Sequence, residues 1–253
     1  MILAADNLTA THPPVAQALD RLDAAPIQEL ARRCEQAGAR CLDLNPGYLG
    51  GRRADRLAFM VEAVQAVTDL PLILDSPEAP VLARGLAVCR GRPILNALTL
   101  EPRKLSEILP LAVSHDTDLV LLLLDERSMP PPDLEGKLAL AAELGERAVS
   151  AGLQAQRLIF APVLPNLSWP DACAQTGAVL RAVRWLAGGA VFGDPVRTMA
   201  GLSNLRSGFR RVYPPSLEAA VLAMLAGAGL TLALADALSP AVQEAFDLIR
   251  QMG

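Results

Sequence analysis

Short apolar runs alternate with helix-forming segments eight times along this chain, and this alternation constrains the fold more than any other feature. The clearest unit lies in the middle of the chain, where the run 72–74 ends on Asp75 and, after one helix-forming segment, the run 93–95 ends on Asn96. Such apolar runs predict strands buried on both faces, which occur in parallel sheets covered by helices. The carboxyl ends of parallel strands lie side by side, so Asp75 and Asn96 are expected to be neighbours.

The remaining units follow at regular spacing, and no linker divides the chain. Ser76 is suited to the N-cap of the helix after Asp75, with Pro77 at its first helical position. Strands are expected at 2–4, 41–45, 72–74, 93–95, 119–124, 158–160, 196–200 and from 230. Helices are expected at 26–37, 54–67, 76–88, 105–114, 134–151, 171–185, 216–226 and 239–252.

Eight strand-helix units in 253 residues predict an α/β protein with a single (β/α)8 TIM barrel that occupies residues 1–253. A doubly wound open sheet is the alternative. Neither G-x-G-x-x-G nor a P-loop lies at a strand-to-helix turn, which counts against a nucleotide-binding sheet.

Composition narrows the classes of function. Hydrophobic residues make up 52% of the chain and the formal net charge is −4, without a basic cluster, so no nucleic-acid partner is expected. The four cysteines have no C-x-x-C spacing, which indicates reduced thiols in a cytoplasmic protein without a bound metal. Residues 219–235 carry no charge, but Gly227 and Gly229 interrupt them, so no membrane span is expected.

Polar side chains follow the predicted strands, where barrels of this kind place their active sites. They are acidic or amide residues almost without Lys, Arg or His: Asn7, Asp43, Asn45, Asp75, Asn96, Asp125 and Asn204. A carboxylate accepts two parallel hydrogen bonds from an amidine-like edge, and an amide both donates and accepts. The set therefore favours a neutral heterocycle rich in amide and amino groups. Alternatives stay open, since Asp43 and Asn45 equally suit loop amides and Asn204 also suits a turn with positive φ.

Six stretches match a known family in the right order: CLDLN (41–45), LDSP (74–77), ILNAL (94–98), LLDERSMP (123–130), IFAPVLP (159–165) and GLSNLRSG (201–208). With them the chain resembles the pterin-binding barrels, and within these the methyltetrahydrofolate:corrinoid (iron–sulfur) protein methyltransferases. Asn7 in DNLT also falls where the family keeps an Asn after its first strand.

The resemblance implies roles for individual residues. Asp75 and Asn96 would hold the pterin ring, Ser203 would lie in the substrate site, and Asn204 would hydrogen-bond to the methyl-bearing N5. A hydrogen bond that strengthens as charge develops on N5 contributes to rate rather than to ground-state affinity. The resemblance further implies one-carbon metabolism, a Co(I) corrinoid on a partner protein as methyl acceptor, a homodimer, and no metal held by this chain.

One departure from the family concerns the pterin contacts themselves. After the sixth strand the family usually carries an Asp that grips the 2-amino/N3 edge of the pterin, and this chain has Ala161. Losing such a carboxylate costs about 1.5–3 kcal/mol of binding free energy, and Asp125 is a candidate to compensate. Two alternatives therefore stay open: a dihydropteroate synthase-like enzyme, although 201–209 lacks that enzyme's Lys, and a degenerate barrel that binds a pterin or a partner without turnover.

Overall fold

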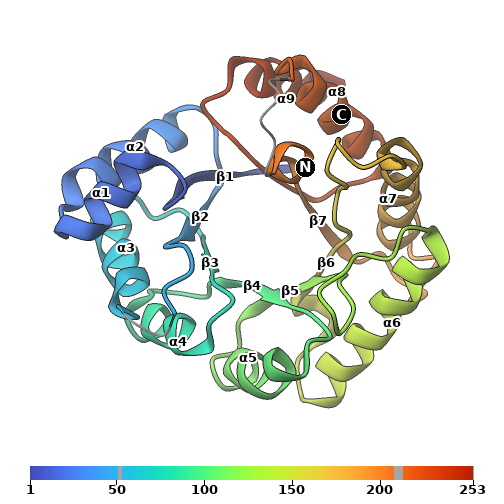
Figure 1. Cartoon of the computed structure of the whole chain (residues 1–253), viewed down its shortest axis with the longest axis horizontal. Helices are drawn as coiled ribbons and strands as arrows, with labels where there is room; N and C mark the ends of the chain where they lie inside the picture. Colours follow the sequence, from blue (N-terminus) through green and yellow to red (C-terminus); the bar gives the residue numbers. More distant parts are fainter. Residues whose placement is uncertain (51–52, 208–212, 253) are drawn as a thin grey trace.

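Eight parallel strands close into a barrel in the computed structural model, which describes residues 1–50, 53–207 and 213–252. The strands follow one another around the barrel in chain order, which Figure 1 shows for β1 to β7, and β8 pairs with β1. Their bounds are β1 Ile2–Thr9, β2 Cys41–Asn45, β3 Leu72–Asp75, β4 Ile94–Leu98, β5 Asp118–Leu122, β6 Leu158–Ala161, β7 Arg197–Gly201 and β8 Leu232–Ala235. The predicted single (β/α)8 barrel is confirmed.

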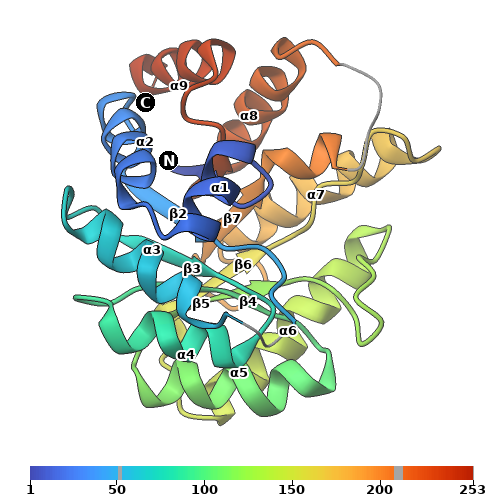
Figure 2. The same cartoon turned by 60° about the vertical axis from the view of Figure 1, so that its left-hand side comes forward.

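Helices form the outer layer, and Figure 2 shows α3, α4 and α5 following one another around the outside of the strands. The helices are α1 Pro13–Arg21, α2 Ala24–Gln36, α3 Asp55–Gln65, α4 Ala79–Val88, α5 Pro102–Ser114, α6 Leu134–Ser150, α7 Ala172–Ala187, α8 Ser216–Ala228 and α9 Pro240–Met252. Short 3-10 helices are η1 Ala155–Arg157 and η2 Leu202–Arg206. In the part of the chain that the structure describes, no helix has the length and apolar character needed to cross a membrane.

Two apolar cores result from the alternation of side chains along each strand. The larger one lies between the strands and the helices. The smaller one fills the barrel itself and is built from one inward set: Ala4, Cys41, Ile73, Ile94, Ala97, Val120, Ile159, Ala161, Met199, Leu232 and Leu234. Because side chains alternate, the residue two positions after an inward apolar side chain also points inward, and at the end of a strand it lies at the carboxyl end of the barrel.

The first helix was not expected, and β1 is longer than the predicted 2–4. α1 begins at Pro13, directly after the strand. Its first two residues are Pro13 and Pro14, and proline fits the first helical turn because the amide hydrogen it lacks has no partner there. The predicted start at 26 for the next helix is also late, since Asp23 caps α2 by accepting from the Ala25 amide at 3.1 Å.

The predicted cap at Ser76 is wrong. Ser76 Oγ accepts from the Glu78 amide at 3.2 Å, so this side chain closes a turn before the helix. Glu78 then occupies the cap position, and Pro80 lies in the first turn of α4. β5 likewise ends at Leu122, not at 124, and β8 begins at Leu232 rather than at 230.

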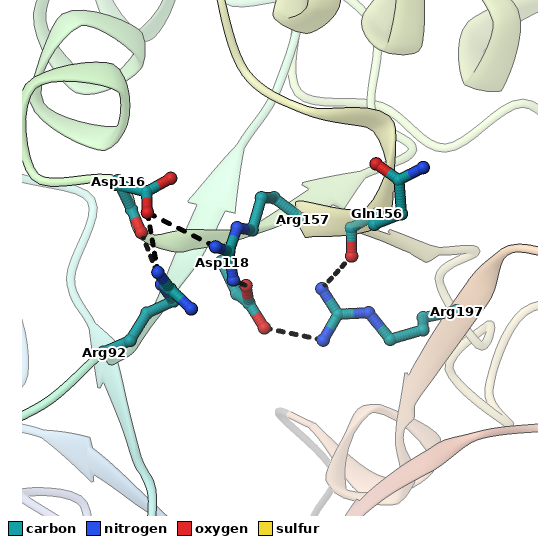
Figure 3. A network of polar contacts seen from close by, with 6 residues as sticks. All are labelled: Arg92, Asp116, Asp118, Gln156, Arg157 and Arg197. Atoms are coloured by element: carbon teal, nitrogen blue, oxygen red, sulfur yellow. Dashed lines mark hydrogen bonds and ion pairs between the residues drawn. The ribbon is translucent and has the colours of Figure 1, made fainter.

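An ion network fastens the amino-terminal ends of the strands (Figure 3). Arg197 Nη1 lies 2.6 Å from Asp118 Oδ2, and Arg157 Nη1 lies 3.5 Å from Asp118 Oδ1. Arg157 also reaches Asp116 at 3.3 Å, which in turn pairs with Arg92 at 2.7 Å. The network therefore links residues at the starts of β4 to β7, opposite the carboxyl ends of the strands.

Candidate functional site

Two adjoining cavities of about 460 and 320 Å³ open at the carboxyl end of the barrel. They share five lining residues: Asn45, Asp75, Ser203, Asn204 and Leu234. The larger cavity is also lined by Asp6, His12, Asp43 and Arg206, and the smaller by Asn96, Lys104, Leu122, Ala161 and Met199. Most of the side chains expected in the site thus lie around one continuous space.

The polar wall of this space comes from β2 and β3. Asp43 and Asn45 follow the inward-facing Cys41 at alternate positions, and Asp75 follows Ile73 in the same way. Asn45 Nδ2 donates to Asp75 Oδ2 at 2.9 Å, while Asn45 Oδ1 accepts from the Gly47 amide at 2.8 Å. The Asn45 amide is therefore held at both ends, and protein groups alone orient the Asp75 carboxyl.

Burial makes ionisation of these carboxyl groups costly. Burial raises the pKa of Asp75 to about 6, against hydrogen bonds from Asn45 and Asn96 and the charge of Lys104, which lower it. Burial raises the pKa of Asp43 well above its ordinary value, and the charges of Asp75 and Asp6 add to the rise. Asp43 is 2% exposed, and its Oδ1 has no hydrogen-bond partner in the described protein. A ligand that donates hydrogen bonds would relieve both costs.

The loop after β7 supplies the facing wall. Ser203 and Asn204 lie on η2, which the buried side chains of Leu202 and Leu205 anchor. Arg206 Nε lies 2.6 Å from Glu218 Oε1 on α8, and Glu218 is 4% exposed. This ion pair fixes the end of η2 to the barrel's outer layer. Gly208, the last residue of the matching stretch 201–208, lies outside the described residues.

Asn7 does not line either cavity. It is buried, donates from Nδ2 to Asp236 Oδ1 at 2.5 Å, and accepts from the Ala237 amide at 2.9 Å on Oδ1. Its side chain therefore fastens β1 to the loop after β8. Alternation from the inward-facing Ala4 brings Asp6 to the cavity instead, a signal that the sequence contained.

Asp125 also lies away from the cavities. Its Oδ1 accepts from the amides of Arg127 at 2.9 Å and Met129 at 2.8 Å, so the carboxylate closes its own loop. Because β5 ends at Leu122, Asp125 does not extend the strand into the site. The compensation for Ala161 that we expected from Asp125 is therefore wrong.

Besides Asp6, three other ionisable residues of the cavities were not expected, namely His12, Lys104 and Arg206. His12 Nδ1 lies 2.9 Å from the Asn7 carbonyl oxygen, just before α1. Lys104 comes from α5, and burial lowers its pKa, although the charges of Glu101 and Asp75 oppose that shift. His12 could have been identified from the sequence only if the helix α1 that follows it had been predicted. Lys104 lies in α5, and the sequence of that helix does not indicate which of its side chains reach the cavity.

The wall formed by β5, β6 and β7 differs in character, because it presents Leu122, Ala161 and Met199. Ala161 is 2% exposed and brings no hydrogen-bonding side chain. Within residues 1–50, 53–207 and 213–252, no three His, Cys, Asp or Glu side chains are arranged to hold a metal ion. The site can therefore receive a molecule that donates hydrogen bonds toward β2 and β3 and is apolar toward β5, β6 and β7.

Comparisons with known proteins agree with this geometry. The family model described as "Pterin binding enzyme" matches residues 10–238. A methylcorrinoid:tetrahydrofolate methyltransferase of Eubacterium limosum is 28% identical over 170 residues, which are 66% of this chain and 62% of the relative. A methionine synthase of Mycobacterium leprae is 28% identical over 121 residues, 46% of this chain and 10% of that protein. The matched stretches thus span less than two thirds of either relative.

Solved structures show the same fold. A dihydropteroate synthase of Xanthomonas albilineans, in complex with indole-2-carboxylic acid and 6-chloroguanine, superposes with a TM-score of 0.72 at 18% identity. The match covers 99% of this chain and 91% of that one. At this identity the likeness concerns the fold, and the assignment comes from the family model over residues 10–238: the chain belongs to the pterin-binding enzyme family.

Proposed function

We propose that the protein transfers a methyl group from methyltetrahydrofolate, or a related N-methyl donor, to a Co(I) corrinoid carried by a partner protein. The observation that carries the proposal is that Asp75, Asn96 and Asn204 face one space from β3, β4 and the loop after β7. These are the residues that the resemblance assigns to the pterin ring and its N5. The methylcorrinoid:tetrahydrofolate methyltransferase relative supports the same pair of substrates.

The barrel's own contribution is binding and electrostatics. Asp75 accepts hydrogen bonds from the pterin, and Asn96 beside it completes the contact. Asn204 donates to N5 as its electron pair develops, so its hydrogen bond strengthens in the transition state. The corrinoid supplies the cobalt nucleophile. The relative's name describes transfer in the opposite direction, and microscopic reversibility requires the same groups in both.

The unit of function in this proposal is the barrel 1–253, acting as a cytoplasmic homodimer beside its corrinoid partner. Asp43 and Asn45 support the polar wall of the pterin site, and Ser203 supports Asn204. Asn7 and Asp125 have structural roles, because each hydrogen-bonds to other protein groups away from the cavities.

Dihydropteroate synthesis is the second candidate, because the resemblance to the pterin-binding barrels leaves it open. The described part of η2, 202–206, contains Asn204 and Arg206 where that activity would call for a Lys. Ala161 favours the third candidate, binding without turnover.

The deciding experiment combines calorimetric titration with methyltetrahydrofolate and single-turnover transfer to free cob(I)alamin, for the wild type and Asn204→Ala. We expect micromolar binding to both proteins, and a rate constant lower by about 10²–10³ in the variant. Binding without transfer would favour the non-catalytic barrel. Absence of binding at millimolar ligand would overturn the methyltetrahydrofolate assignment, and condensation of a pterin pyrophosphate with 4-aminobenzoate would establish the synthase.

A further inference from the structure

Asp6 is the carboxyl group that the structure connects to the Asn204 loop. It faces into the barrel from β1 and lines the larger cavity together with Ser203 and Asn204. The Ser203 hydroxyl lines the same cavity and lowers the pKa of this carboxyl as a hydrogen-bond donor, and Ser203 directly precedes Asn204. A path of polar groups therefore runs from Asp6 to the residue that meets N5 in the proposed function.

The surroundings of Asp6 bring the pKa of its carboxyl close to neutral pH. The charged and titratable groups that interact with it are Asp236 after β8, His12 before α1, Glu218 on α8, Asp43 on β2 and Cys34 on α2. Burial, then the charges of Asp236 and Glu218, raise the pKa of Asp6 to about 6, against the His12 charge and the Ser203 hydrogen bond. A carboxyl with such a pKa both holds and releases a proton near neutral pH.

Other groups around the cavity are less suited to this task. The Asn204 amide donates a hydrogen bond but does not give up its proton. Ala161 has no proton to give. Asp75 Oδ2 is engaged by Asn45, and the proposed function uses Asp75 to hold the ring.

We propose that Asp6, acting through the Ser203 hydroxyl, supplies the proton that N5 takes up when the methyl group leaves, and accepts it in the reverse direction. This inference rests on the proposed function. When the C–N5 bond breaks, its electron pair stays on N5, and the methyl carbon bonds to cobalt with the electron pair of Co(I), which is oxidised to Co(III). N5 takes the Ser203 hydroxyl proton, the Asp6 proton replaces it, and Asp6 is left as a carboxylate.

The test uses single-turnover transfer from methyltetrahydrofolate to free cob(I)alamin by the wild type, Asp6→Asn, Asp6→Glu and Ser203→Ala. General acid catalysis contributes about 10²–10⁴ in rate, so we expect Asp6→Asn to lose that factor below pH 6 while its affinity for methyltetrahydrofolate stays within about threefold. Asp6→Glu restores part of the rate, and Asp6→Asn/Ser203→Ala is no slower than Asp6→Asn alone. The exposed Asp247→Asn on α9 serves as the matched control.

The decisive readout is the ratio of wild-type to Asp6→Asn rate constants across pH 5–8, because the titration of N5 itself cancels in that ratio. For transfer from methyltetrahydrofolate we expect the ratio to fall above about pH 6, where Asp6 has lost its proton. For the reverse reaction, which methylates tetrahydrofolate, we expect the ratio to rise above about pH 6. A ratio independent of pH would overturn the inference and leave the proposed function standing. Lack of transfer by a wild type that binds the pterin would overturn both. Thermal unfolding of each variant checks that the barrel is intact.

Discussion

The side-chain amide of Asn45 donates a 2.9 Å hydrogen bond to Asp75 Oδ2 across the neighbouring strands β2 and β3. The Gly47 amide fixes the other end of Asn45 through its Oδ1. Two residues separated by 30 positions thereby set the orientation of one carboxylate before any ligand binds. Such preorganisation lowers the cost of ordering the site on binding.

Replacing Asp75 with Asn is expected to weaken methyltetrahydrofolate binding by about 10- to 100-fold, since a charged hydrogen-bond acceptor is worth about 1.5–3 kcal/mol. Calorimetric titration measures the change. Asp125→Asn is the matched control, because that carboxylate closes its own loop and is expected to leave the affinity unaltered. Equal losses in both variants would contradict the placement of the pterin beside Asp75.

Introducing the missing carboxylate through Ala161→Asp is expected to tighten pterin binding by about 10- to 100-fold. The smaller cavity of about 320 Å³ has room for the side chain. Without a ligand the same variant is expected to melt at lower temperature, because the new carboxyl is buried without a partner. Melting curves with and without methyltetrahydrofolate check both effects. Ala161→Asn is the control, because Asn has nearly the size of Asp but carries no charge. Weaker binding in Ala161→Asp would mean that the ligand presents no amidine edge to β6.

The fold followed from the sequence because the apolar runs and their spacing are local signals. Asp43, Asn45, Asp75, Asn96 and Asn204 were found at the cavity for the same reason, since each follows a buried run or its turn. Together with Ser203, six of the eight residues expected in the site thus line the cavities, while their roles stay predictions.

The misses have physical causes as well. Asn7 and Asp6 are adjacent, and only the alternation within β1 tells which one faces the cavity. Asp125 looked like a strand end because its apolar run continues past Leu122, where hydrogen bonding to β6 rather than composition ends the strand. Lys104 depends on how α5 packs, which the sequence around it does not reveal.

Asp43→Asn is expected to stabilise the protein, and more so at higher pH. The pKa of Asp43 is raised in the folded state, so from about pH 4 upward the unfolded chain loses this proton first and wild-type stability falls as the pH rises. Asn mimics the neutral carboxyl and avoids that fall. Each 1 kcal/mol corresponds to about 2–4 °C in melting temperature for a domain of this size. Melting temperatures of both proteins between pH 4.5 and 8 should diverge; a constant difference would contradict the raised pKa.

Asp118→Asn is expected to destabilise the fold by about 1–2 kcal/mol without changing pterin affinity. Its carboxylate pairs with Arg157 and Arg197 in the ion network, and its side chain is 16% exposed. Denaturant unfolding gives the stability, and titration gives the affinity. Glu107→Gln, which removes a more exposed helical pair with Arg103, is the control and should cost less. A loss of affinity in Asp118→Asn would show that the two ends of the barrel are coupled.

The position of that ion network has an evolutionary consequence. It holds the starts of β4 to β7, while the cavity residues lie at the other ends of the strands. A barrel secured at one rim can accumulate substitutions at the other without unfolding, as long as each spares the strands themselves. A carboxylate at position 161, which the resemblance implies and where this chain has Ala161, could be exchanged in this way without loss of the scaffold.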